Sequence, residues 1–300
     1  MTRALLVPPP LLPGDRVALI APSGPFDRAA FERGVAAIEA QGYVCEHAPD
    51  IFARDGYFAG DDERRVRELR WALSAGEVRW LVAARGGFGA TRLLPHISAD
   101  EVRAAGKGLV GFSDITALHA LWARAGVASL HASMVAKLGD AADATRARWF
   151  SALSGAPLVA FRGLECICDG RVEGPLVGGN LAVLAALVGT PFAPPLDGAI
   201  LFLEDVGERP YRLDRMLTTL TQAGWFEKVR GLVFGAFTES TPGPDGVSAR
   251  DVLVRHARSL GLPAVLGLPV GHVDDNHELP LGPVAALDAS SGTLSWTVRG

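Results

Sequence analysis

The chain of 300 residues has no cluster of lysine and arginine residues and no long apolar run. Its net charge is −4, whereas nucleic-acid binding depends on a basic surface, so we expect no nucleic-acid partner. No apolar run approaches the ~20 residues that a membrane span needs. The first ten residues are too short and too rich in proline for a signal peptide. These absences predict a soluble, cytoplasmic protein without a membrane partner.

Cysteine is scarce, with only Cys45, Cys166 and Cys168 in the whole chain. Three cysteines do not make a disulfide framework. Cys166 and Cys168 lie in a β-like run and lack the ligand spacing of a zinc site. We therefore expect all three to be reduced and to have structural roles.

The first half of the sequence alternates the patterns of strands and helices. Apolar residues make up 49% of the chain, enough for a well-buried core. We expect strands at 16–21, 43–46, 78–84, 108–111 and 127–131, and helices at 26–41, 62–73, 115–122 and 140–154. This alternation is typical of a parallel sheet covered by helices on both faces.

The character of the sequence changes after residue 155, where short β-like pieces and turns follow a hinge at 155–157. We expect an N-terminal domain at 1–155, a linker at 156–170 and a C-terminal domain at 171–300. The second half mixes expected helices at 181–187, 213–220 and 248–260 with strands at 199–203, 231–237, 284–287 and 293–298. The predicted fold class is α/β, with an N-terminal parallel-sheet domain followed by a mixed α+β domain.

The stretch Gly108–Thr116 predicts a strand, a tight turn and a helix in direct succession. A serine on such a turn, here Ser113, projects its hydroxyl out of the sheet, where the N–H groups of the helix start also point. Nucleophilic serine enzymes use this geometry. The alternative is that Ser113 or Asp114 is a helix N-cap. The turn also lacks the second glycine of Gly-x-Ser-x-Gly.

A glycine-rich loop, Arg85–Gly89, follows the expected strand at 78–84. It fits neither the P-loop pattern nor Gly-x-Gly-x-x-Gly. Its glycines let the backbone approach a ligand closely, and a Gly87 N–H near Ser113 would help to form an oxyanion cradle. A plain strand–helix connection is the alternative.

An acid and a histidine follow Ser113 in chain order. Glu204 and Asp205 stand at the end of an apolar strand, where open α/β sheets bind their ligands. Either could instead pair with one of the nearby arginines, which are Arg209, Arg212 and Arg215. His272 lies in a polar loop, where a lone histidine is usually solvated. A serine, an acid and a histidine together can form a nucleophilic triad. The α/β-hydrolases share this order, but the missing Gly-x-Ser-x-Gly and the mixed second half disfavour that fold.

Several segments spread over nearly the whole chain match one known family. The main ones are Arg85–Gly89, Gly111–Thr116, Gly178–Leu181, Leu203–Glu208, Pro210–Leu217 and Gly271–His272. Further matches at the two ends are Pro13–Asp15, Ala21–Ser23 and Leu279–Gly282. On these segments the chain resembles the LD-carboxypeptidase family of serine peptidases, which includes muramoyltetrapeptide carboxypeptidases and microcin-C self-immunity peptidases. Six collinear matches are far more specific than any one alone.

The resemblance implies roles for five residues. Ser113 is the implied nucleophile, Glu204 the acid and His272 the base, with the backbone N–H groups of Gly87 and Asp114 as the oxyanion hole. The implied fold is an N-terminal α/β domain like that of the class I amidotransferases and a mixed C-terminal domain, with the triad split between them. The family is metal-independent, so we expect neither metal nor cofactor, and its members are usually homodimers.

The activity that the resemblance implies is cleavage of an L–D peptide bond to release a terminal D-amino acid. The substrate we expect is a murein tetrapeptide that loses D-Ala during peptidoglycan recycling. An exopeptidase must hold the free carboxylate of its substrate, and Arg85 is a candidate for this contact. Phe88 is a candidate substrate contact, and it departs from the family, which often has tyrosine there. A second departure is His131-Ala132-Ser133, where the family commonly has His-Gly-Pro.

Two other functions stay open on the sequence. The first is an immunity-type hydrolase that acts on a peptidyl or aminoacyl nucleotide and needs an aromatic residue to stack on the base. Trp225 is available for this, although a tryptophan just after a helix more often belongs to the core. The second is a non-catalytic ligand-binding protein built on the same two-domain frame.

Overall fold

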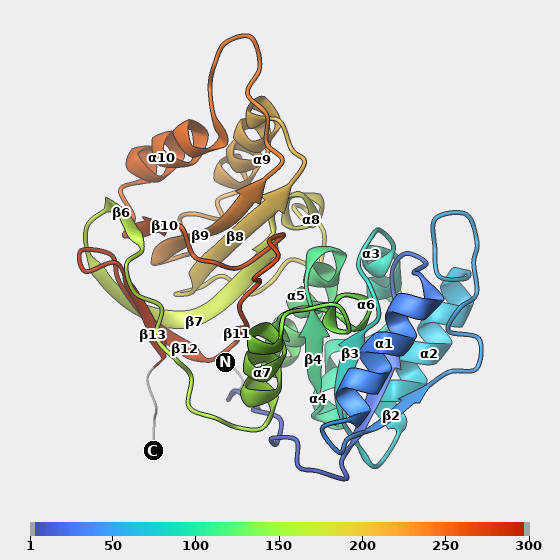
Figure 1. The fold of residues 1–300 in the computed structure, drawn as a ribbon. Helices are drawn as coiled ribbons and strands as arrows, with labels where there is room; N and C mark the ends of the chain where they lie inside the picture. The colour runs from blue at the N-terminus through green and yellow to red at the C-terminus, as the bar shows by residue number, and fades with distance from the viewer. Residues whose placement is uncertain (1–3, 297–300) are drawn as a thin grey trace. The chain divides into compact units, whose positions relative to one another are not determined.

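The computed structural model describes residues 4–296, which form two compact units (Figure 1). Unit 1 comprises the chain up to Pro157 together with His277–Pro280. Unit 2 comprises Leu158–Asn276 and the chain from Leu281 onward. Each unit has its own sheet.

Unit 1 is built on a six-stranded sheet in the order β11-β5-β4-β3-β1-β2. Its strands are β1 (Arg16–Ile20), β2 (Val44–His47), β3 (Val78–Ala83), β4 (Gly108–Gly111), β5 (Ser129–His131) and β11 (Leu279–Leu281). β1 to β5 pair in parallel, so their carboxyl ends share one edge of the sheet. The chain leaves β1 for β2 on one side and returns to β3 on the other, and ligands of open α/β sheets bind at such a switch point.

The helices of unit 1 connect these strands. They are α1 (Arg28–Glu39), α2 (Asp62–Ser74), α3 (Ala90–Leu93), α4 (Ala99–Ala105), α5 (Thr116–Ala125), α6 (Val135–Leu138) and α7 (Asp143–Leu153), with 3₁₀ turns η1 (Leu94–His96) and η2 (Ser113–Ile115). Asp27 and Asp61 start α1 and α2 by accepting hydrogen bonds from backbone N–H groups of the first turn, as N-caps do.

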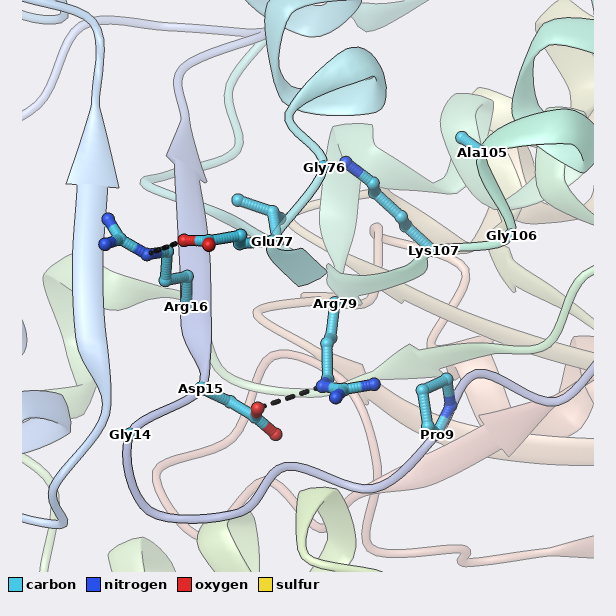
Figure 2. A pocket seen from close by; sticks show the side chains of 11 residues that line it. Pro9, Gly14, Asp15, Arg16, Gly76, Glu77, Arg79, Ala105, Gly106 and Lys107 are labelled. Atoms are coloured by element: carbon cyan, nitrogen blue, oxygen red, sulfur yellow. Dashed lines mark ion pairs between the residues drawn. The ribbon is translucent and has the colours of Figure 1, made fainter.

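A cavity of about 670 Å³ borders the amino ends of β1 and β3 (Figure 2). Four of its charged residues form two ion pairs: Arg16 Nε lies 2.6 Å from a carboxylate oxygen of Glu77, and Arg79 Nε lies 2.9 Å from Asp15. Lys107 donates to two backbone carbonyls at the end of α2, where a cation is favoured. These contacts stabilise the edge of the sheet formed by the amino ends of its parallel strands.

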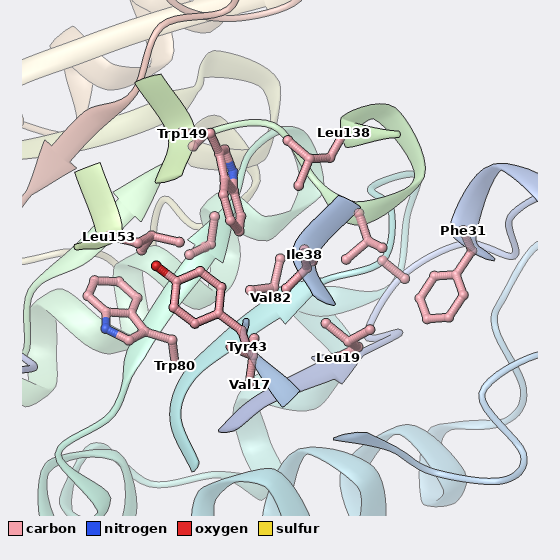
Figure 3. Packing of buried hydrophobic residues seen from close by; sticks show 14 of the residues in the cluster. Val17, Leu19, Phe31, Ile38, Tyr43, Trp80, Val82, Leu138, Trp149 and Leu153 are labelled. Atoms are coloured by element: carbon pink, nitrogen blue, oxygen red, sulfur yellow. The ribbon is translucent and has the colours of Figure 1, made fainter. Parts of the chain in front are cut away.

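One face of the sheet packs against α1, α6 and α7 in a large apolar cluster (Figure 3). Val17 and Leu19 of β1 and Val82 of β3 belong to it, with Phe31 and Ile38 from α1. Ala18 of β1 and Leu81 and Ala83 of β3, which point to the other face, are buried as well, and α2 contacts both strands. The strands are therefore buried on both faces, which explains their continuous apolar runs.

Unit 2 holds a seven-stranded sheet in the order β13-β12-β7-β8-β9-β10-β6. Its strands are β6 (Glu165–Cys168), β7 (Arg171–Asn180), β8 (Ile200–Val206), β9 (Gly231–Thr238), β10 (Ala264–Leu266), β12 (Val284–Asp288) and β13 (Thr293–Trp296), and its helices are α8 (Leu181–Ala186), α9 (Pro210–Gln222) and α10 (Ala249–Leu260). β7 to β10 are parallel, whereas β12, β13 and β6 pair in antiparallel orientation at the two sides. The expected α/β class with a parallel N-terminal sheet and a mixed second half is confirmed.

Some elements differ from the sequence-based expectation. The short α3, α4, α6, β10 and β11 were not expected, because three to seven residues carry too little periodicity. Residues 158–161 make only one isolated bridge, at Phe161, although their pattern is β-like. The strand expected at 293–298 is β13 as far as Trp296, and its last two residues lie outside the described part of the chain.

No helix within residues 4–296 is long and apolar enough to cross a bilayer. The three cysteines are all free. Burial raises the pKa of the Cys45 thiol to about 12. Cys166 is exposed, and its Sγ donates to Asp169 Oδ1 at 3.2 Å.

Candidate active site

Ser113 follows β4 after one residue, Phe112, and is held in a strained backbone conformation. Its φ is +63°, and only one other non-glycine residue of the described chain, Glu239, has a positive φ. Residues with side chains rarely adopt this region, and such strain concentrates at functional sites. The sharp strand-to-helix turn at Ser113 is the local geometry of a nucleophile elbow.

The capping alternative for this turn is wrong. Among the residues that the structure describes, no side chain makes a capping hydrogen bond at the start of η2 or α5. The carboxylate of Asp114 instead accepts hydrogen bonds from the Ser23 hydroxyl at 2.6 Å and from the Ala90 N–H at 2.8 Å. The strain at Ser113 therefore does not serve a helix cap.

The glycine-rich loop after β3 lies against Ser113, because β3 and β4 are neighbours in the sheet. A Cβ placed on Gly86 would lie 3.0 Å from Ser113 Cβ and 3.1 Å from Ser113 Oγ. Gly87 has a φ of +116°, and a Cβ there would lie 3.2 Å from the backbone of Gly24. A side chain at Gly86 would crowd Ser113, and one at Gly87 would crowd Gly24 in the loop after β1. The backbone of the loop at Gly86 therefore lies next to the Ser113 side chain.

In unit 2, the carboxylate of Glu204 pairs with the ring of His272. Glu204 Oε2 lies 2.7 Å from His272 Nδ1, and the Glu204 side chain is 0% exposed, against 18% for His272. The register between β8 and β9 shifts between Leu203 and Asp205, so Glu204 sits at an irregularity of the ladder. Such bulges re-aim a side chain. The contact leaves Nε2 as the ring nitrogen that does not bond to Glu204.

The loop that carries His272 is tied to β9 and to itself. Thr238 Oγ1 donates to the His272 carbonyl at 3.0 Å, and the Gly271 N–H donates to Oδ1 of the buried Asn276 at 2.8 Å. The Ala236 N–H donates to the Val270 carbonyl at 2.9 Å. These bonds fix the backbone on both sides of His272. The expectation of a solvated loop histidine is therefore wrong.

The arginine-pairing alternative for the two acids is also wrong. Glu204 is buried against His272, and Arg212 pairs with Glu208 instead. Asp205 accepts hydrogen bonds from Asn180 Nδ2 and from backbone N–H groups at the start of α8 and in β8. Burial, with a further contribution from the charge of Glu204, raises the pKa of Asp205 to about 6. Asp205 thus anchors α8, a role that the sequence did not suggest.

Gly271 allows the close approach of His272 to Glu204. Its φ is +129°, and a Cβ there would lie 2.7 Å from Glu204 Oε2 and 3.0 Å from Glu204 Cβ. We expect Gly271→Ala to lower the free energy of unfolding by about 1–3 kcal/mol through backbone strain. It should also lower kcat by on the order of 100-fold, since small displacements of catalytic groups cost that much. Thermal unfolding and steady-state kinetics measure the two effects.

Gly267→Ala is the matched control for this substitution. Gly267 lies in the same loop at a φ of +90°, with nothing within 4 Å of an added Cβ. It should carry a similar strain cost and leave kcat within a few-fold of wild type. Equal losses of kcat in the two variants would show that the close approach to Glu204 has no special importance.

The remaining candidates occupy varied environments. Arg85 is exposed, and its Nη1 donates to the Pro25 carbonyl at 2.6 Å. Phe88 is 48% exposed and lies near the rings of Tyr57 and Phe58. Trp225 is 5% exposed and belongs to the core, so it does not present a stacking surface.

The two histidines near the elbow are core residues. His119 is buried between Ser129 Oγ and the Gly111 carbonyl, and burial lowers its pKa to about 3. His131, which precedes the Ala132-Ser133 departure, is fully buried against Phe112. Among residues 4–296 no group of three or more histidine, cysteine or acidic side chains is placed to hold a metal ion.

The candidate residues thus form two groups. Ser113, Gly87 and Asp114 belong to unit 1, and Glu204 and His272 belong to unit 2. Sequence reasoning missed the side-chain role of Asp114 and the anchoring role of Asn276. The sequence around Asp114 gave no indication of its side-chain role, because the partners of the Asp114 carboxylate lie 24 and 91 positions away in the chain.

Known proteins resemble this chain over nearly its whole length. It is 35% identical to a putative carboxypeptidase of Synechocystis, with 99% of each chain covered. It is 32% identical to the murein tetrapeptide carboxypeptidase of Pseudomonas aeruginosa, with 94% of this chain and 95% of the relative covered. The crystal structure of a muramoyltetrapeptide carboxypeptidase from Oxalobacter formigenes has a TM-score of 0.84 at 33% identity and covers 93% of this chain and 97% of its own.

Solved structures with much lower sequence identity to this chain have the same fold. The structure of MccF in complex with glutamyl sulfamoyl guanosine has a TM-score of 0.88 at only 20% identity, with 98% of this chain and 99% of that one covered. Residues 17–132 match the LD-carboxypeptidase N-terminal domain, and residues 173–287 match the LD-carboxypeptidase C-terminal domain. The chain therefore belongs to the LD-carboxypeptidase family.

Proposed function

We propose that this chain is a serine carboxypeptidase that cleaves an L–D peptide bond and releases a terminal D-amino acid. The substrate of the proposal is a murein tetrapeptide, which loses D-Ala. The observation that carries the proposal is the contact of 2.7 Å between the buried Glu204 carboxylate and His272 Nδ1. A histidine oriented in this way is the usual partner of a nucleophilic serine. The murein tetrapeptide carboxypeptidase of Pseudomonas aeruginosa supports the substrate class.

In the proposed mechanism, His272 and Ser113 act together on the substrate. Glu204 accepts the Nδ1–H of His272, which fixes the tautomer and leaves Nε2 to take the Ser113 proton. Ser113 Oγ attacks the carbonyl carbon of the scissile bond. The protonated His272 then gives its proton to the leaving amino group of the D-amino acid, and water hydrolyses the acyl-enzyme by the same steps.

The proposed oxyanion hole consists of the backbone N–H groups of Gly87 and Asp114. The strained turn at Ser113 and the packing of the glycine-rich loop against it at Gly86 support this assignment of the two donors. Loss of one such donor typically costs ~10²–10³ in kcat. Arg85 and Phe88 are the proposed substrate contacts, with Arg85 for the free carboxylate. The cytoplasmic location and the homodimer stay predictions.

Incubation of the purified protein with murein tetrapeptide tests the substrate. We expect mass spectrometry to show loss of one alanine and formation of the tripeptide. The matched control is the same tetrapeptide ending in L-Ala, which should stay intact, because the proposal requires an L–D bond. Absence of tripeptide from the natural substrate, with the protein folded, would contradict the assignment.

Two further probes distinguish the proposed function from the two alternatives. An aminoacyl-sulfamoyl adenosine that is cleaved or competes more strongly than the tetrapeptide would favour a hydrolase of aminoacyl nucleotides. The burial of Trp225 removes the residue on which that alternative relied. A serine-directed fluorophosphonate that fails to label the protein would favour a non-catalytic binding protein.

A further inference from the structure

The carboxylate of Asp114 joins three loops at the carboxyl edge of the unit 1 sheet. These loops follow β1, β3 and β4, which are neighbours or next neighbours in the sheet. The carboxylate belongs to the loop after β4, and it accepts from Ser23 Oγ in the loop after β1. It also accepts from the N–H groups of Ala90 and Gly89 at the end of the loop after β3. One buried side chain thus connects all three.

The contacts around this carboxylate leave it little freedom. Asp114 is 2% exposed, and Ser23 and Ala90 are fully buried. The first two loops are joined a second time, by the hydrogen bond of 3.0 Å from the Gly24 N–H to the Gly86 carbonyl. Burial raises the pKa of the Asp114 carboxyl, while its three hydrogen bonds oppose that shift. Hydrogen bonds from several donors stabilise the ionised form.

Asp114 occupies a special place in the proposed site, because its backbone N–H is one proposed oxyanion donor. Its carboxylate holds Gly89 and Ala90, which immediately follow the Gly87–Phe88 stretch that contains the other proposed donor. The same residue therefore sets the separation of the two N–H groups. Backbone donors stabilise a developing charge only when they are held in place before the reaction.

We propose that the Asp114 side chain is a positioning residue that fixes the glycine-rich loop and the serine turn at the spacing of a working oxyanion hole. The inference rests on the proposed function of that site. It requires no contact between the carboxylate and the substrate. It predicts an effect on transition-state stabilisation that is larger than the effect on substrate binding.

Asp114→Asn tests this role while keeping the backbone N–H and the side-chain volume. The Ser23 hydroxyl and the Ala90 N–H both donate to Oδ2, so an amide oxygen at that position can keep both contacts, but it carries no charge to strengthen them. We expect kcat for the tetrapeptide to fall 10- to 100-fold with KM within three-fold of wild type. The rate at which a fluorophosphonate labels Ser113 should fall by a similar factor. This second readout does not depend on the identity of the substrate.

Lys107→Met is the control for simple loss of stability. Lys107 is buried at the opposite end of the same sheet, where it bonds to carbonyls at the end of α2. We expect this variant to lose Tm and to keep kcat and the labelling rate. If Asp114→Asn keeps both rates within three-fold, or loses only what Lys107→Met loses at an equal fall in Tm, the positioning role is wrong.

Ser23→Ala decides the question if Asp114→Asn does not fold. It removes one of the three donors and leaves the backbone donors in place, so we expect kcat to fall at least three-fold. An unchanged kcat would overturn the inference. If the fluorophosphonate labels the wild-type protein but the protein does not cleave the tetrapeptide, only the proposed substrate is wrong. The labelling rates of the variants then still test the role of Asp114.

Discussion

Replacement of Ser113 by alanine is expected to lower kcat by on the order of 10⁴–10⁶-fold, because loss of a serine nucleophile removes the whole covalent route. The stability of the protein should change little, since the side chain is small and alanine, which also has a Cβ, keeps the same strain at φ +63°. Release of D-Ala from the tetrapeptide measures the first effect and thermal unfolding the second.

Labelling by a fluorophosphonate gives the control for Ser113→Ala. Peptide mapping should place the adduct on Ser113 in wild type and find none in the variant. Ser133 is a matched alternative serine, because it lies in the same unit and is buried. Ser133→Ala should therefore still be labelled. Residual turnover of Ser113→Ala near the wild-type rate would exclude Ser113 as the nucleophile.

Replacement of Glu204 by glutamine is expected to lower kcat by roughly 10³–10⁴-fold. The amide has almost the same shape, so it can remain against His272, but it carries no charge to stabilise the imidazolium. It can also present its NH₂ group to Nδ1 and so favour the wrong tautomer of the ring. KM should change by no more than a few-fold, because Glu204 is fully buried and does not contact the substrate in the proposed mechanism.

Glu208→Gln is the matched control for Glu204→Gln. Glu208 follows the same strand and pairs with Arg212 at 3.3 Å near the surface. Its replacement should leave kcat unchanged, since exposed ion pairs contribute little. Comparable losses of kcat in the two variants would remove the special role of the Glu204–His272 pair.

The sequence was sufficient to predict most of the longer elements. The alternation of apolar strands and amphipathic helices identified β1, β3, α1 and α2, since long periodic segments carry a strong signal. The turn at Ser113 was also readable, because a strand, Gly-Phe-Ser-Asp and a helix follow one another without a gap. The chemistry of this turn could not be predicted from the local sequence, because the pattern alone favoured a helix cap at the same residues.

The remaining features depend on contacts between distant residues. The pairing of Glu204 with His272 joins positions 68 apart, and local patterns favoured arginine partners for the acid and solvent for the histidine. The place of the Gly86–Gly87 loop beside Ser113 follows from the order of β3 and β4 in the sheet, which no local pattern specifies. Family resemblance supplied these pairings as expectations, and the catalytic roles stay predictions.

The distance between Ser113 Oγ and His272 Nε2 in a crystal structure with the tripeptide product bound tests the central claim most directly. The proposed mechanism requires a proton to pass between these two atoms. We predict a separation of about 2.6–3.2 Å, the reach of a general base. A product-bound structure in which another group occupies that position beside Ser113, and His272 lies beyond the reach of a bridging water, would contradict the account.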